Sequence, residues 1–185
     1  MRPLILRHSL SLDGYSAPPP GMREDLFPEY DEDEEFIAHM AALLGSAGVH
    51  AMGARTYRDM AGHWPFQDGP EAEAMNSIPK VVFSRSPLDT PWARTTVCSG
   101  DLATEVARLK AEHGGPILAH GGVRLAQALV RGDLVDEYHL LVGPFAYGGG
   151  SPLFPEVTRL KLIDVRKFPK GNLALRYSRP DAVSS

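Results

Sequence analysis

Residues 117–125 read Ile-Leu-Ala-His-Gly-Gly-Val-Arg-Leu, an apolar run that stops at two glycines and gives way to a helical pattern. Such a run predicts a buried strand, and the pattern over 123–130 predicts an amphipathic helix. Glycines at the turn would let a ligand come close to the backbone, and the free N–H groups of the new helix would suit a phosphate. A tight turn without a ligand would have the same sequence, so this motif alone leaves both interpretations open.

A second strand-to-helix junction follows the short apolar run at 49–52. Gly53 frees the backbone there, and Thr56 is suited to cap the helix or to contact a phosphate. Arg55 adds a guanidinium fork that matches phosphate oxygens.

A third junction ends the strand expected at 80–84, where Ser84 and Arg85 bring a hydroxyl and a guanidinium. A 2′-phosphate on an adenosine ribose, which distinguishes NADPH from NADH, needs such a pair. A single arginine is more often a surface residue in a weak salt bridge. Three junctions in strand order nevertheless predict a dinucleotide-binding edge, although the Rossmann Gly-x-Gly-x-x-Gly spacing is absent.

The remaining pattern alternates strands with helices and ends in a hairpin. Strands are expected over 4–10, 49–52, 80–84, 117–120, 137–145, 160–168 and 172–178, and helices over 33–44, 57–61, 101–112 and 123–130. This order predicts an α/β fold with a central, mostly parallel mixed sheet, helices on both faces and an antiparallel C-terminal edge hairpin. Ligands of such sheets bind beyond the carboxyl ends of the strands, where the three junctions fall.

The length and composition of the chain limit the classes of function that it can have. The chain has 185 residues, which predicts one domain over 1–180 and a frayed tail at 181–185. Eight of the 23 acidic residues lie within 24–35, so the rest of the chain carries 15 acids against 19 bases. That mild balance does not predict nucleic-acid binding. No run is long enough to cross a membrane, and a single cysteine, Cys98, predicts a cytoplasmic protein.

Five motifs, taken together, resemble a known family. The motifs occur along the chain in the expected order. Together they make the chain resemble the dihydrofolate-reductase-like superfamily, and most closely the C-terminal reductase domain of the bifunctional riboflavin-biosynthesis deaminase/reductase. The matching stretches are Ser-Leu-Asp-Gly at 11–14, Gly-Ala-Arg-Thr-Tyr at 53–57, Phe-Ser-Arg at 83–85, Gly-Gly at 121–122, and Leu-Val-Asp-Glu-Tyr at 134–138 leading to Gly-Gly-Gly-Ser-Pro-Leu-Phe at 148–154.

The resemblance implies a dihydrofolate-reductase-like three-layer sandwich, NADPH as cofactor, hydride transfer to a small pterin- or pyrimidine-like ring, and a homodimer. It implies that the cofactor is bound by Gly53, Arg55, Thr56, Ser84, Arg85, Gly121, Gly122, Val123, Arg124 and Leu125.

Two positions depart from the family pattern. The riboflavin-pathway reductases usually have a lysine directly after Asp-Gly and a glutamate directly before Gly-Gly, both near the substrate. This chain has Tyr15 and His120 there. The lysine that would hold a ribosyl phosphate is missing, which argues against the riboflavin intermediate as substrate.

Substrate and catalytic residues are predicted more weakly. Tyr15, Phe36, Met40, Trp64 and His120 are the candidate substrate contacts, and each has an alternative interpretation as a core, edge or turn residue. Asp13 and Asp33 are the candidate acids. Asp13 is more often a turn-forming residue, and Asp33 or its neighbour Glu32 is more often a helix N-terminal acid.

A loop over 15–32 is a candidate lid. The seven histidines show no metal-ligand spacing. The alternative to an enzyme is a module that binds a dinucleotide without turnover.

Overall fold

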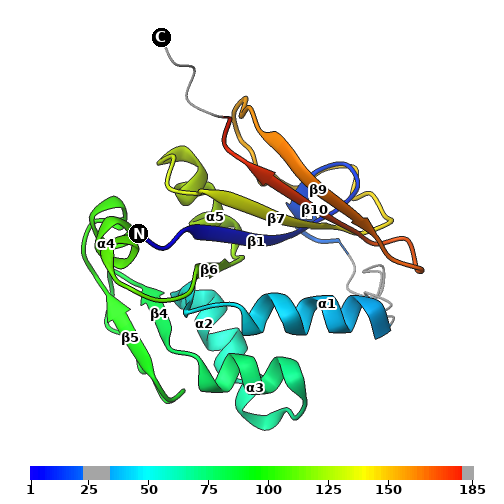
Figure 1. The fold of residues 1–185 in the computed structure, drawn as a ribbon. Helices are drawn as coiled ribbons and strands as arrows, with labels where there is room; N and C mark the ends of the chain where they lie inside the picture. Colours follow the sequence, from blue (N-terminus) through cyan, green and yellow to red (C-terminus); the bar gives the residue numbers. More distant parts are fainter. Residues whose placement is uncertain (23–33, 181–185) are drawn as a thin grey trace.

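The computed structural model describes residues 1–22 and 34–180, which build an eight-stranded sheet with helices on both faces (Figure 1). In spatial order the strands are β5 (Thr95–Cys98), β4 (Lys80–Phe83), β3 (Val49–Gly53), β6 (Ile117–His120), β1 (Leu4–Leu10), β7 (Glu137–Val142), β10 (Leu173–Ser178) and β9 (Lys161–Lys167). The first six pair in parallel, and β10 and β9 are antiparallel. A separate small antiparallel sheet joins β2 (Tyr15–Ala17) to β8 (Ser151–Pro152).

Alternating side chains along the strands divide the core into two layers. On one face, Leu4, Leu6 and Ala119 pack against α4 (Leu102–Ala111) and α5 (Val123–Arg131). On the other, Ile5 and Leu118 pack against α1 (Glu34–Gly45), α2 (Ala54–Ala61), the 3₁₀ turn η2 (Trp64–Phe66) and α3 (Pro70–Ser77). Because successive strand residues point to opposite faces, this alternation fixes a three-layer sandwich.

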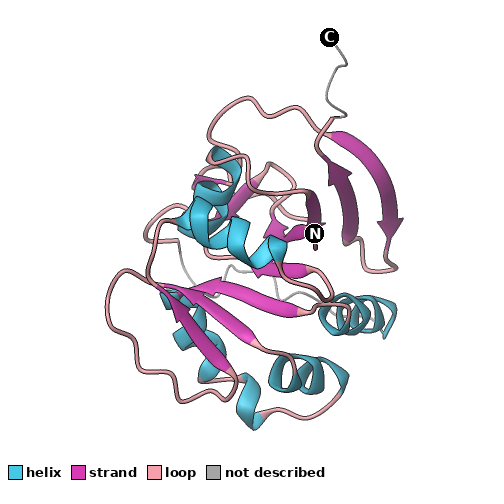
Figure 2. Cartoon of the chain, turned by 60° about the vertical axis from the view of Figure 1, so that its left-hand side comes forward, coloured by secondary structure: helices cyan, strands magenta, loops and turns pink. Residues whose placement is uncertain are grey.

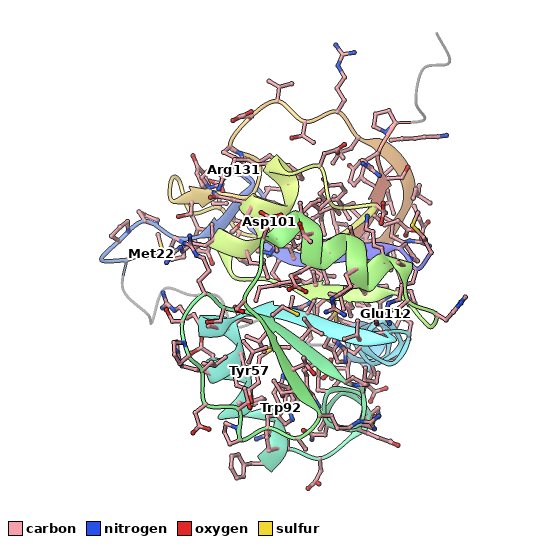
Figure 3. All side chains as sticks on the ribbon, turned by 90° about the vertical axis from the view of Figure 1, so that its left-hand side faces the viewer. Met22, Tyr57, Trp92, Asp101, Glu112 and Arg131 are labelled. Atoms are coloured by element: carbon pink, nitrogen blue, oxygen red, sulfur yellow. The ribbon has the colours of Figure 1, made fainter. Side chains whose placement is uncertain are left out.

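The figures show the same layering. Seen from the β5 edge, α4 runs between Asp101 and Glu112 above β4 and β5, and Tyr57 and Trp92 lie near each other in the lower part of the molecule (Figure 3). The backbone N–H of Trp92 donates a hydrogen bond of 3.1 Å to the Tyr57 hydroxyl. The β9–β10 hairpin stands at the margin of the molecule (Figure 2). Its turn packs on α1, where the ring centroids of Phe168 and Phe36 lie 5.2 Å apart.

The predicted α/β fold, its mostly parallel sheet and its C-terminal antiparallel hairpin are confirmed. Among the described residues, five elements were not predicted: α3, η2, β5, β2 and β8. β5 shows no burial alternation that a sequence pattern would reveal, because Thr96 and Val97 are both exposed.

Three boundaries need correction. The strand expected over 137–145 ends at Val142, because Pro144 has no N–H to continue the pairing. The strand expected to reach Ser84 ends at Phe83. Residues 15–17, expected within a lid loop, form β2. Residues 18–22 of that loop are described and belong to no helix or strand. The rest of the loop at 23–32, which includes Glu32, then Asp33 and the tail at 181–185 lie outside the described residues.

In the described part of the chain, no helix is both long enough and apolar enough to cross a membrane. The homodimer and the cytoplasmic location stay predictions.

Candidate functional site

The ends of β3 and β6 are joined to each other. These strands are parallel neighbours, so the helices that follow them, α2 and α5, begin at the same edge of the sheet. The Thr56 hydroxyl in the first turn of α2 donates a hydrogen bond of 2.7 Å to the carbonyl of Gly121. Leu125 of α5 lies beside Gly53, within 3.8 Å of where a Cβ would sit. The two junctions therefore form one continuous edge.

Both glycines after β6 are required by space. A Cβ on Gly121 would lie 2.7 Å from Nδ1 of the buried His8, and one on Gly122 would lie 2.5 Å from the Thr56 hydroxyl oxygen. Gly122 also has a φ of +126°, which side-chain-bearing residues rarely adopt. The backbone at the start of α5 is therefore bare, in the sense that no side chain at Gly121 or Gly122 covers it.

The helices that begin at this edge lack side-chain caps. Gly53 and Gly122 stand at the N-cap positions of α2 and α5, and no described side chain caps either helix. By contrast, Asp101 caps α4 by accepting a 3.0 Å hydrogen bond from the Thr104 N–H. Uncapped first-turn N–H groups, with the positive end of the helix dipole, favour an anion.

Arginines surround this edge. Arg55 lies in the first turn of α2, Arg124 in the first turn of α5, and Arg85 follows β4; all three are exposed. Ser84 differs from the expectation, since its hydroxyl donates a 2.7 Å hydrogen bond to the carbonyl of Ser86. In this conformation Ser84 has no hydroxyl proton left for a phosphate, and Arg85 is the stronger candidate.

Beside the edge, on the face covered by α1, α2 and α3, lies a pocket of about 160 Å³. Its walls are mostly apolar, with an arginine, a serine, a carboxylate and a histidine among them. The lining residues are Arg7, Ser9, Phe36, Met40, Leu44, Met60, Trp64, Glu71, Met75 and His120.

The structure brings four of the five predicted substrate contacts into this pocket: Phe36, Met40, Trp64 and His120. Tyr15 is not among the described lining residues and instead pairs with Pro152 between β2 and β8.

Sequence reasoning missed the other lining residues, Arg7, Ser9, Leu44, Met60, Glu71 and Met75. Polar residues at alternate positions of the first strand were the available signal for Arg7 and Ser9.

His120 forms a buried pair. Its Nε2 lies 2.8 Å from Nδ1 of His50 on β3, and the two residues are 1% and 0% exposed. Burial lowers the pKa of His50 to about 4. Burial also lowers the pKa of His120 well below its ordinary value, and the neighbouring His50 and Arg7 lower it further. Both rings are therefore neutral at pH 7.

Of the candidate acids, Asp13 is held in a structural role. Its carboxylate accepts hydrogen bonds from the Ser11 hydroxyl (2.6 Å) and from the N–H groups of Tyr147 (3.1 Å) and Gly148 (2.7 Å). The Ser11 hydrogen bond, followed by those from the two backbone groups, lowers the pKa of Asp13. This geometry favours a turn anchor over a proton donor. Asp33 lies outside the described residues.

Residues 2–174 match the model of one protein family, described as the RibD C-terminal domain. The chain belongs to the RibD C-terminal domain family. Among the described residues of this RibD C-terminal domain, no group of three or more histidine, cysteine, aspartate or glutamate side chains is placed to hold a metal ion.

Other proteins resemble the domain over nearly its whole length. A putative riboflavin biosynthesis protein from Shewanella is 25% identical, with a TM-score of 0.70 over 97% of this chain and 99% of its own. A Thermotoga maritima diaminohydroxyphosphoribosylaminopyrimidine deaminase/5-amino-6-(5-phosphoribosylamino)uracil reductase is 15% identical, with a TM-score of 0.67 over 97% of this chain and 57% of its own. The uncharacterized protein YyaP of Bacillus subtilis is 25% identical over 95% of this chain and 94% of its own. These likenesses confirm the expected resemblance.

Proposed function

We propose that this RibD C-terminal domain is an NADPH-dependent reductase that delivers hydride to a small, flat heterocycle of the pyrimidine or pterin type. One observation carries the proposal: His120 lines the pocket, and the next two residues, Gly121 and Gly122, form the bare start of α5. A ring in the pocket and a dinucleotide along the edge would therefore meet at the end of β6. The family membership and the reductase named among the structural relatives support the chemistry.

The residues at the edge fit a dinucleotide phosphate. The N-terminal N–H groups of α2 and α5, with Arg55 and Arg124, would hold the pyrophosphate. Arg85, after β4, would meet the 2′-phosphate that separates NADPH from NADH. The bound cofactor supplies the hydride, and the protein orients the ring and excludes water from it.

The pocket fits a small ring better than a sugar phosphate. Its volume of about 160 Å³ is close to that of a cavity, about 150 Å³, that takes up a single benzene ring. Arg7 is the one cationic side chain among its described lining residues, and the carboxylate of Glu71 also lines the pocket. A ring without a phosphorylated ribose is therefore the preferred substrate class.

An assay of NADPH oxidation tests the proposal. 5-Amino-6-(5-phosphoribosylamino)uracil, the substrate in the name of the Thermotoga relative, would be compared with phosphate-free pyrimidines and dihydropterins. We expect oxidation with a phosphate-free ring and little with the phosphorylated one. Binding of NADPH without turnover of any ring would favour the alternative function, a non-catalytic dinucleotide-binding module.

Replacing Arg55 or Arg85 by alanine is expected to weaken NADPH binding roughly tenfold to a hundredfold, because each loses a charge-assisted contact to phosphate worth about 1.5–3 kcal/mol. Fluorescence titration with NADPH and NADH measures both affinities. Arg85→Ala should spare NADH, which has no 2′-phosphate, whereas Arg55→Ala should weaken both.

Arg131→Ala is the matched control, because Arg131 is an exposed arginine at the far end of α5. A change of less than about threefold in both edge variants (under roughly 1 kcal/mol) would remove the phosphate assignments.

A further inference from the structure

A row of polar side chains crosses the otherwise apolar sheet face that carries the pocket. It runs from Lys80 on β4 through His50 on β3 and His120 on β6 to Arg7 on β1. Lys80 and His50 are register partners, as are His120 and Arg7. The neighbouring positions on this face are Ile5, Met52, Val82 and Leu118, all in the apolar core. A polar row here requires an explanation, because buried polar groups are costly unless they are paired.

The two ends of the row differ in what they can do. The Lys80 ammonium donates hydrogen bonds to the carbonyls of Asn76 (2.9 Å) and Ala93 (3.3 Å), so it is held by the backbone. His50 does not line the pocket, whereas His120 and Arg7 do. His50 therefore acts on any ligand only through His120.

The proton positions in the histidine pair follow from the surroundings. A neutral imidazole has one N–H and one acceptor nitrogen. The backbone of Ala74 on α3 offers the His50 ring a carbonyl acceptor, which acts to raise the pKa of His50 against the larger effect of burial. The contact falls short of full hydrogen-bond geometry, because His50 Nε2 has no hydrogen-bond partner among the described residues. That acceptor favours the His50 proton on Nε2, so Nδ1 accepts from His120. The His120 proton then lies on Nε2, and its Nδ1 is left with a lone pair.

We infer that His50 is a positioning residue that holds His120 in the tautomer with an unprotonated Nδ1, so that the pocket meets its ligand with an uncharged hydrogen-bond acceptor. The ligand class that fits is a neutral ring with an N–H or O–H donor on the edge that faces His120. The other charged groups of the pocket, Arg7 and Glu71, are of opposite sign, so the described lining has no net charge to favour an ion. This inference rests on the proposed function only in taking the pocket as the substrate site.

The tautomer is tested on the ligand-free protein. Long-range proton–nitrogen NMR spectra of protein labelled with ¹⁵N-histidine report which ring nitrogen carries the proton. We expect His120 protonated at Nε2 in the wild type. We expect the same in His50→Asn, whose amide oxygen replaces the Nδ1 acceptor, and a tautomer mixture in His50→Leu. A proton on Nδ1 of His120 in the wild type, or an unchanged His120 spectrum in His50→Leu, would overturn the inference.

The ligand class is tested with uracil and 1,3-dimethyluracil, two neutral rings of which only the first has N–H donors. In the wild type and in His50→Asn, uracil is expected to shift the His120 Nδ1 resonance and to bind at least tenfold more tightly than the methylated ring. In His50→Leu that preference should disappear. Equal binding of the two rings to the wild type, or binding of neither, would contradict the proposed ligand class.

Thermal unfolding with and without NADPH shows whether each variant is folded and keeps its cofactor edge. If NADPH does not change the thermal unfolding of the wild type but His120 has the expected tautomer, the proposed function is contradicted and the role of His50 still stands.

Discussion

Acidification is expected to unfold this protein as the pH falls from 6.5 to 4, because three buried histidines must stay neutral in the folded state. Burial, aided by Arg7, lowers the pKa of His8 to about 4, and burial lowers that of His50 to the same value. The unfolded chain takes up these protons near pH 6.5, whereas the folded chain does so only near pH 4. In that window the unfolded state binds more protons, so stability is lost as the pH falls. For His8 and for His50, the shift from 6.5 to about 4 corresponds to a loss of about 3 kcal/mol each as the pH falls through this window. That is a large part of a typical domain stability of about 5–15 kcal/mol.

Urea unfolding at a series of pH values measures this loss, and His8→Leu isolates one ring. Both ring nitrogens of His8 are buried without a hydrogen-bond partner among the described residues. The His8→Leu variant should therefore be as stable as the wild type at neutral pH, or more stable. Between pH 6.5 and 4, its free energy of unfolding should fall less steeply with pH, by up to about 1.4 kcal/mol per pH unit. His63→Gln, at an exposed histidine, is the control. A free energy of unfolding that stays level through this range would contradict the account of the buried rings.

Gly122→Ala is expected to destabilise the fold by about 1–3 kcal/mol and to weaken NADPH binding at least tenfold. The new Cβ would lie 2.5 Å from the Thr56 hydroxyl oxygen, and a φ of +126° is unfavourable for alanine. Relief of the clash would break the hydrogen bond from Thr56 to Gly121, which holds α2 and α5 together at the proposed cofactor edge. Thermal unfolding and NADPH titration measure the two effects separately.

Gly149→Ala is the matched control for that variant. Gly149 has an ordinary φ, and no heavy atom lies within 4 Å of an added Cβ. It should therefore keep both stability and affinity. If Gly122→Ala bound NADPH as tightly as Gly149→Ala, the bare backbone at the start of α5 would not be part of a cofactor site.

Local signals in the sequence were enough to predict most of the fold. The apolar runs at 4–10 and 117–120 and the glycine pair after the second each specify their element within a few residues. Helix α3 was missed although Gly69 and Pro70 offer a start signal, because only Ala72, Ala74 and Met75 of its eight residues are buried and the apolar stripe is short.

The site was only partly accessible from the sequence. Phe36 and Met40 could be proposed from a helix face, His120 from its place directly before the glycine pair, and Trp64 as an aromatic wall residue. All four lie in one pocket. Missing α3 concealed Glu71 and Met75. The His50–His120 pair joins residues 70 positions apart, and no spacing rule predicts such a contact. The roles of these residues in binding and catalysis stay predictions.

The most direct test of the central claim, a reductase that binds NADPH along the β4–β3–β6 edge, is a thermal-shift titration with NADPH and, separately, with NADH. A ligand at about 100 times its dissociation constant stabilises the folded state by about 2.7 kcal/mol, which raises the melting temperature measurably. A clear rise with NADPH and little with NADH is the predicted result. No response to either nucleotide would contradict the account and leave the fold without its proposed cofactor.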